Sequence, residues 1–271
     1  MASRLAWVIA ALLLLAVAYV SAEAASQRAE YAIVVVLDQF VPYYLEVYDL
    51  PNLRELIKNG VLFEGAWVGH MASSTIVSHP VIHTGRFPKA FCMVDYGWRD
   101  PKNSSRVINP GDLRFILAGG VREIMEGSGV KSVSYYIKQR WPDAKTAGGS
   151  SKAHVAPGFE PHMDIAFLAL PVKINGTDYY VPGYKVPSYL NDSRFWLPKS
   201  ELYNKADEWV MDISIEILRR ERPRFMVINL PLIDVWGHRT GGQAALEEME
   251  PWVKNADRQL GRLIDELKAL G

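Results

Sequence analysis

The chain has 271 residues, and its 30 lysine and arginine residues balance its 30 aspartate and glutamate residues. The formal net charge is therefore zero, so overall charge gives no reason to expect nucleic-acid binding. Hydrophobic residues make up 49% and charged residues 22% of the chain, which excludes a disordered, collagen-like or coiled-coil protein. The single cysteine, Cys92, excludes a disulfide scaffold and a cysteine-rich metal site, whereas six histidines leave a His/Asp metal site possible.

Residues 1–24 are typical of an export signal. A basic residue precedes an uninterrupted apolar run over residues 5–20, and Ala22 and Ala24 provide the small residues that cleavage requires. The run is short for a membrane-spanning helix, but an uncleaved anchor is the alternative, so membrane association through residues 5–20 stays open. In both cases we expect residues 25–271 to be secreted or otherwise extracytoplasmic. Three glycosylation tripeptides agree with this location, at Asn103, Asn175 and Asn191.

The first part of the exported chain predicts strands that alternate with helices. Residues 31–37 (YAIVVVL) form a continuous apolar, β-branched run, typical of a strand buried on both faces. A helix over residues 51–59 and a strand over residues 61–67 follow. The next predicted helix covers residues 75–84 and ends at Gly85.

The alternation continues to the end of the sequence. The predicted helices cover residues 113–125, 205–220 and 246–270, and the predicted strands cover residues 130–137 and 224–230. Residues 141–203 are rich in Pro, Gly, Ser and Asn with weak periodicity, and we interpret them as an insertion or cap. This order predicts a layered α/β domain over residues 25–271, with a mostly parallel central sheet flanked by helices.

Three polar clusters follow predicted strands, where ligands bind in such folds. Asp38 ends the first strand and is either a metal ligand or a turn and capping residue. Thr75, after Ser73 and Ser74, opens a helix and is either an activated nucleophile or part of a helix cap. Asp234 and His238 lie four apart after the last strand, so both can reach one metal ion, although a surface loop could carry the same residues. Gly237 between them is expected to allow a tight turn.

The remaining histidines give weaker signals. His79 and His83 share one face of the predicted helix, where they are metal ligands or, as we prefer, core histidines with satisfied hydrogen bonds. The other three, His70, His154 and His162, show no useful spacing.

Five sequence blocks occur in an order that resembles the alkaline phosphatase superfamily, and within it type I phosphodiesterases/nucleotide pyrophosphatases. They are VVVLDQF (34–40), LPNLRELIKNGVLFEGAW (50–67), SSTIVSHPVIHTGRFP (73–88), ERPRFMVINLPLIDVWGH (221–238) and ADRQLGRLIDELKALG (256–271). The resemblance implies an alkaline-phosphatase-like fold and hydrolysis of a small-molecule phosphate ester at a site with two divalent metal ions, expected to be zinc. Thr75 corresponds to the nucleophile and metal contact, Asp38 to a ligand of one metal, and Asp234 and His238 to ligands of the other.

The sequence also departs from the family pattern. Ile76-Val77-Ser78 stands where the family has Phe-Pro-Asn, and Tyr96 lies where an asparagine usually binds phosphate, so Tyr96 becomes a candidate substrate contact. In monoesterase-like relatives a Lys-x-Arg after a strand binds phosphate. Lys138 and Arg140 match that pattern, with a solvated strand end as the alternative.

The family's next block, a strand ending in Asp-His-Gly and a later metal-binding histidine, would follow Gly271. The resemblance therefore predicts a chain truncated at its C-terminus, with an uncovered sheet edge and weak metal binding. A diesterase is the preferred function. The alternatives are a monoesterase and an inactive exported pseudo-enzyme that acts as a binding module. A sulfatase is disfavoured because the residues around Cys92 lack the sulfatase nucleophile motif.

Overall fold

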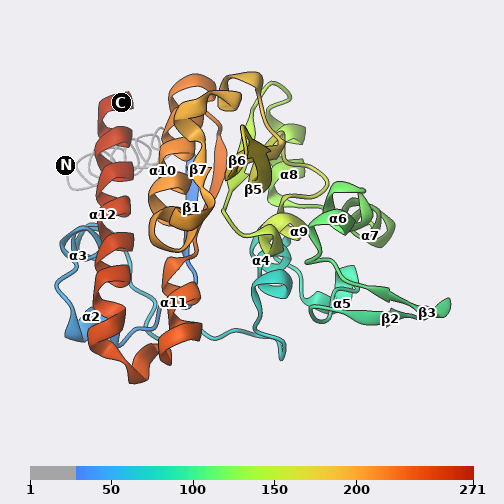
Figure 1. Ribbon diagram of the computed structural model, residues 1–271, viewed down its shortest axis with the longest axis horizontal. Coiled ribbons are helices and arrows are strands. Elements are labelled where there is room, and N and C mark those ends of the chain that lie inside the picture. The colour runs from blue at the N-terminus through green and yellow to red at the C-terminus, as the bar shows by residue number, and fades with distance from the viewer. Residues whose placement is uncertain (1–28) are drawn as a thin grey trace, which may run out of the picture. The chain divides into compact units, whose positions relative to one another are not determined.

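A six-stranded sheet organises residues 33–271, which form one unit (Figure 1). The computed structural model describes residues 29–271, so the predicted export signal and the apolar run at 5–20 lie outside the described residues. Within the described part, no helix combines the length and apolar character needed to cross a membrane. The strand order is β1 (Ala32–Leu37), β8 (Phe225–Leu230), β4 (Thr146–Gly149), β5 (Ile165–Ile174), β6 (Thr177–Lys185) and β7 (Leu197–Pro198).

The centre of this sheet is parallel. Strand β4 pairs in parallel with β8 and with β5, whereas β6 pairs antiparallel with β5 and β7. At the other edge, the amide of Asp38 donates a 3.2 Å hydrogen bond to the carbonyl of Leu230, so the carboxyl ends of β1 and β8 meet. The prediction of a mostly parallel central sheet is therefore confirmed, and one edge of it gathers several strand ends.

The sheet is buried on both faces, as the apolar run of β8 shows. Met226, Ile228 and Leu230 belong to one hydrophobic cluster, while Phe225 and Val227 belong to the other. Successive side chains of a strand point to opposite faces, so a strand between two helical layers carries apolar residues on both faces. This explains why residues 224–230 show no alternation and why the strand prediction there is correct.

Helices cover both faces. Helix α12 (Leu246–Leu270) packs against α10 (Leu202–Glu221), α11 (Leu232–Thr240) and α3 (Pro51–Lys58). On the other side of the sheet, α4 (Thr75–Thr84) packs against α8 (Val133–Arg140) and α9 (Ala156–Phe159) (Figure 1). The remaining helices are α2 (Tyr44–Val47), α5 (Pro88–Phe91), α6 (Leu113–Leu117) and α7 (Gly120–Ser128). Strands β2 (Trp98–Asp100) and β3 (Asn103–Ile108) form a separate antiparallel hairpin. Short 3-10 turns occupy Ala153–Val155, Ser188–Asn191, Ser193–Phe195, Lys199–Glu201 and Gly242–Ala244.

Several local predictions were wrong. Residues 61–67 form no strand, and their apolar side chains are exposed instead of being paired into the sheet. Residues 130–137 are mostly helical, because Ser132 caps α8 by accepting the amide hydrogen of Tyr135. The predicted helix over residues 113–125 is divided into α6 and α7 at Gly119, which has a φ of 85°.

The segment 141–203 is not an irregular insertion, because it supplies β4 to β7. Its first strand reads Thr-Ala-Gly-Gly, a composition that does not indicate a strand. The glycines are required by packing: a Cβ atom at Gly149 would lie 1.8 Å from the Phe167 ring. Packing of the Phe167 ring from the neighbouring strand β5 therefore replaces β propensity as the reason for glycine at position 149.

We expect Gly149→Ala to lower the free energy of unfolding by about 1–3 kcal/mol, because the methyl group overlaps a buried ring that cannot move freely. Urea denaturation measures the change. Gly127→Ala is the matched control, since its Cβ would meet nothing within 4 Å inside α7 and should leave stability equal or higher. Equal stability of the Gly149 variant and the wild type would contradict this account of β4.

Candidate active site

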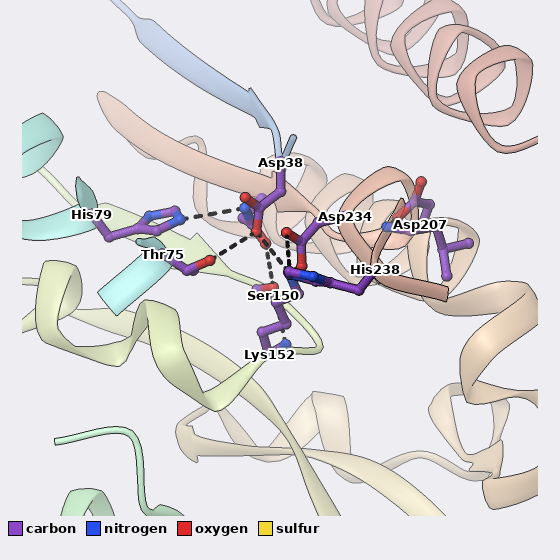
Figure 2. Close-up of polar contacts among 10 residues, drawn as sticks. Asp38, Thr75, His79, Ser150, Lys152, Asp207, Asp234 and His238 are labelled. Atoms are coloured by element: carbon purple, nitrogen blue, oxygen red, sulfur yellow. Dashed lines mark hydrogen bonds and ion pairs between the residues drawn. The ribbon is translucent and has the colours of Figure 1, made fainter. Parts of the chain in front are cut away.

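The candidate site lies at the carboxyl ends of β1, β8 and β4 (Figure 2). Asp38 follows β1, Asp234 lies on the helix after β8, and Lys152 lies just beyond β4. A cavity of about 510 Å³ opens there. Its lining includes Asp38, Gln39, Ser73, Ser74, Thr75, Ser78, His79, Tyr96, Asp234 and His238.

Thr75 is the first residue of α4 and faces Asp38. Its hydroxyl donates a 3.3 Å hydrogen bond to Asp38 Oδ2 (Figure 2). The preceding Ser74 is extended but makes no side-chain cap, and its buried hydroxyl has no partner among the described residues. The side-chain hydrogen bond that a Ser74 helix cap requires is therefore not formed. The amino-terminal end of α4 instead points backbone N–H groups toward the cavity, where negative charge is favoured.

Asp234 and His238 lie on helix α11 and not on a loop. Their i,i+4 spacing places His238 Nε2 3.3 Å from Asp234 Oδ1. The His238 side chain is 73% exposed, whereas that of Asp234 is 17% exposed. Gly237 is helical, so the tight-turn prediction was wrong. A Cβ atom there would lie 1.8 Å from Gln39 Oε1, so the glycine makes room for a side chain from the end of β1.

Lys152 contacts both carboxylates, and no sequence pattern indicated this contact. Its ammonium donates a 2.8 Å hydrogen bond to Asp38 Oδ2 and a second hydrogen bond to Asp234 Oδ2 (Figure 2). The three side chains are only 14–17% exposed. Recognising β4 as a strand would have placed Lys152 at this edge, but its Gly-rich sequence hid that signal.

A buried polar chain supports the floor of the site. Ser150 Oγ donates a 2.7 Å hydrogen bond to Asn229 Oδ1, and Asn229 Nδ2 lies 3.3 Å from His79 Nε2. Burial lowers the pKa of His79 to about 4, with Lys152 lowering it further and Asp38 opposing the shift. His79 is therefore neutral at neutral pH. Sequence reasoning missed Ser150 and Asn229 because both lie in apolar or Gly-rich stretches.

His83 lies deeper in the same helix. Its ring is buried against Phe159 and Phe225, and burial together with His79 lowers its pKa to about 3. The core position preferred for both histidines is confirmed. The expected satisfied hydrogen bonds are not found for His83, because neither ring nitrogen has a partner among the described residues.

The three predicted substrate contacts are separated in the structure. Tyr96 lines the cavity and meets the His154 ring edge-on at a centroid distance of 5.2 Å. Lys138 lies on α8 and pairs with Asp164, whose other oxygen accepts the amide of Thr146 at the start of β4. It is therefore at the opposite end of β4 from the cavity. Arg140 lies over the Trp141 ring, also outside the cavity lining.

These features define an α/β protein with a carboxylate, hydroxyl and histidine cluster at the carboxyl edge of its sheet. The sequence model of the type I phosphodiesterase/nucleotide pyrophosphatase family matches residues 32–271, and the chain belongs to this family. Members of the family are phosphoester hydrolases and depend on metal ions. No individually curated protein sequence matches the chain.

Solved structures similar to this chain have the alkaline-phosphatase-like fold that the sequence predicts. Murine ectonucleotide pyrophosphatase/phosphodiesterase 5 shares 20% identity over 88% of this chain and 52% of its own, with a TM-score of 0.56. An inactive form of that protein in complex with AMP shares 19% identity over 89% and 53%, with a TM-score of 0.54. Phosphonoacetate hydrolase from Sinorhizobium meliloti, in complex with phosphonoacetate, shares 17% identity over 90% and 54%, with a TM-score of 0.56. The chain thus spans about half the length of these structures.

The residues present are of the kinds that hold divalent cations. Carboxylate oxygens of Asp38 and Asp234 already converge on a cation, the ammonium of Lys152. Carboxylates, a hydroxyl and an imidazole are suitable ligands for zinc and similar ions. Within residues 29–271, however, no three His, Cys, Asp or Glu side chains are grouped closely enough to form a ready ligand set.

Asp207 connects the site to the core through helix α11. Its Oδ1 accepts a 3.0 Å hydrogen bond from the amide of Leu232, the first residue of α11 (Figure 2). Burial raises the pKa of Asp207 to about 7, with Glu208 adding to the shift while the Leu232 amide and Lys152 oppose it. The carboxyl group thus holds the helix that carries Asp234 and His238.

This pKa predicts a specific pH dependence of stability. Because the folded pKa lies above the usual value, protonated Asp207 favours folding below about pH 4, and that contribution is lost as the pH rises to about 7. Asp207→Asn keeps an acceptor for Leu232 but cannot ionise. Titration of Asp207 should lower the unfolding free energy of the wild type by up to about 4 kcal/mol between pH 4 and pH 7, and this decrease should be absent from the variant.

Chemical denaturation at several pH values measures this difference. Asp212→Asn is the control, since Asp212 is an exposed carboxylate on α10, the helix that also contains Asp207. The pH profile of this variant should follow that of the wild type. An Asp207 variant with the wild-type slope would show that Asp207 does not titrate in this range.

Proposed function

We propose that the protein hydrolyses small-molecule phosphodiesters or nucleotide-type pyrophosphates, with Thr75 as the nucleophile and two divalent metal ions, expected to be zinc. The observation that carries the proposal is the position of Thr75. Its hydroxyl lies at the amino-terminal end of α4, in the cavity, and is hydrogen bonded to Asp38. That placement gives a hydroxyl both an acceptor for its proton and a positive helix end for its developing charge.

The chain's own residues suggest how the reaction proceeds. Asp38 accepts the hydroxyl hydrogen of Thr75 and so directs the oxygen into the cavity. Thr75 Oγ1 attacks phosphorus in line as its proton passes to Asp38, the bond to the leaving oxygen breaks, and the leaving group takes up a proton. The intermediate is a phosphodiester of Thr75 that keeps the second ester group of the substrate. Water then attacks that phosphorus, the bond to Thr75 Oγ1 breaks, and the phosphate monoester leaves as the hydroxyl of Thr75 is restored. The N–H groups at the start of α4 stabilise phosphate oxygens throughout.

The proposed metal ligands are Asp38 and Thr75 at one position and Asp234 and His238 at the other. Bound divalent ions would supply charge neutralisation of the phosphate and stabilise the attacking and leaving oxygens. His238 is exposed on the cavity lining, so it can turn toward a bound ion without disturbing the core.

Diester hydrolysis is favoured over monoester hydrolysis by the position of the basic residues. A terminal phosphate dianion needs more positive charge than a diester, and Lys138 and Arg140 were the candidates to supply it. Both lie outside the cavity, and Lys138 is paired at the far end of β4. Tyr96 remains as a cavity-lining substrate contact.

We further propose that the protein acts outside the cytoplasm. The support is the export signal expected over residues 1–24, together with the surface position of all three glycosylation tripeptides. Asn103, Asn175 and Asn191 are exposed. An inactive binding module is the remaining alternative, and activity assays separate it from the enzyme.

Thr75→Ala should lower kcat for bis-p-nitrophenyl phosphate about a thousandfold or more, because the nucleophile is lost. Thr84→Ala is the matched control: it removes a hydroxyl from the other end of the same helix, where it bonds to the Pro80 carbonyl, and should retain activity. A diesterase should prefer this substrate to p-nitrophenyl phosphate. Full activity of the Thr75 variant would reject Thr75 as the nucleophile, and an inactive wild type would favour the binding module.

A further inference from the structure

Lys152 lies between Asp38 and Asp234, the two carboxylates that are proposed to hold one divalent ion each. The two aspartates come from segments almost 200 residues apart, yet the Oδ2 atom of each contacts the same ammonium nitrogen (Figure 2). The backbone fixes this arrangement. The amide of Ser150 donates to the Phe167 carbonyl at 3.2 Å, and the amide of Lys152 donates to Ser150 Oγ at 3.1 Å. The lysine is thus anchored at its base as well as at its tip.

The ammonium has a clear physical role in the metal-free protein. Two carboxylates that are 15–17% exposed repel each other strongly unless a positive charge lies between them. Lys152 supplies that charge and allows the carboxyl ends of β1 and β8 to come together. The two side chains are then arranged as cation ligands before any metal ion arrives.

The same position creates a competition. A divalent ion bound to the carboxylate of Asp38 or of Asp234 would take that Oδ2 atom from the ammonium, and two cations cannot occupy adjacent points without strong repulsion. We propose that Lys152 is an internal substitute cation, which stabilises the metal-free site and must leave the carboxylates when a divalent ion binds. This inference rests on the proposed metal-dependent function, and it assigns to Lys152 a role in gating metal entry.

Displacement of the Lys152 ammonium by a divalent ion would favour substrate binding, because it changes the net charge of the site. Two carboxylates and one ammonium sum to one negative charge. Adding a divalent ion changes that sum to one positive charge, provided that the displaced ammonium stays in the cavity. An anionic phosphate ester is attracted only by the second state.

Lys152→Met tests the competition through metal affinity in place of activity. We expect isothermal titration calorimetry to show that the variant binds Zn²⁺ about tenfold or more tightly than the wild type. In the wild type, most molecules have both carboxylates paired with Lys152, and Zn²⁺ binds only to the minor population in which the carboxylates are free. The metal-free variant should also unfold at a lower temperature than the wild type, and Zn²⁺ should raise its Tm more than it raises the wild-type Tm.

Lys138→Met is the matched control. It removes a lysine that pairs with Asp164 at the opposite end of β4, so it can alter Tm but should leave Zn²⁺ affinity unchanged. Unchanged or weaker Zn²⁺ binding by the Lys152 variant would overturn the inference and leave the proposed enzyme intact. No Zn²⁺ binding by either the wild type or the variant would overturn both the inference and the metal-dependent function.

A second measurement needs no variant, in case Lys152→Met fails to fold. Acetylation of wild-type lysines, followed by mass spectrometry, reports how accessible each ammonium is. Lys152 should be protected without metal, because its side chain is 14% exposed and paired, and should become several-fold more reactive with Zn²⁺. Lys138 should not respond. Protection of Lys152 that is unaffected by bound Zn²⁺ would contradict displacement.

Discussion

The contact between Lys152 and the carboxylates of Asp38 and Asp234 is the interaction on which the site depends. It connects the ends of β1 and β4 to the helix that follows β8. Without it, two poorly solvated negative charges would stand side by side, an arrangement that costs several kcal/mol per ion in a protein interior. The lysine allows these segments to pack as closely as the parallel sheet requires.

The surrounding core makes this edge rigid. Strand β8 is filled on both faces, by Met226, Ile228 and Leu230 on one side and by Phe225 and Val227 on the other. Its polar residue, Asn229, is buried and joined to Ser150 and to His79. These contacts join the segment that contains Lys152 and the helix that begins at Thr75 to the same strand. Helix α11 is held separately through Asp207, so each element of the site has its own anchor in the core.

The sequence predicted the parts of the fold whose periodicity is long and regular. Strand β8 and helices α10 and α12 follow from a continuous apolar run or 3.6-residue stripes, and the end of α4 follows from Gly85. The positions of Asp38, Thr75 and Asp234 follow from their places at strand or helix ends. Strand β4 could not be predicted, because its glycines are required by close packing, of Met163 and Phe159 against Gly148 and of the Phe167 ring against Gly149, and not by strand propensity. Lys152 was missed for the same reason. The apolar run at residues 61–67 shows the opposite error, since strand-like composition without a partner strand gives no strand.

Charge explains why this arrangement suits a metal-dependent family. His79 is neutral because burial lowers its pKa to about 4, so it adds no positive charge near the two carboxylates. The positive end of α4 contributes roughly half an elementary charge. This is less than the one negative charge that remains when Lys152 neutralises one of the two carboxylates. An anionic phosphate ester therefore meets an unfavourable potential unless further cations enter. The same carboxylates that repel the substrate are those best suited to hold such cations, so substrate binding and cation binding become coupled through Asp38 and Asp234.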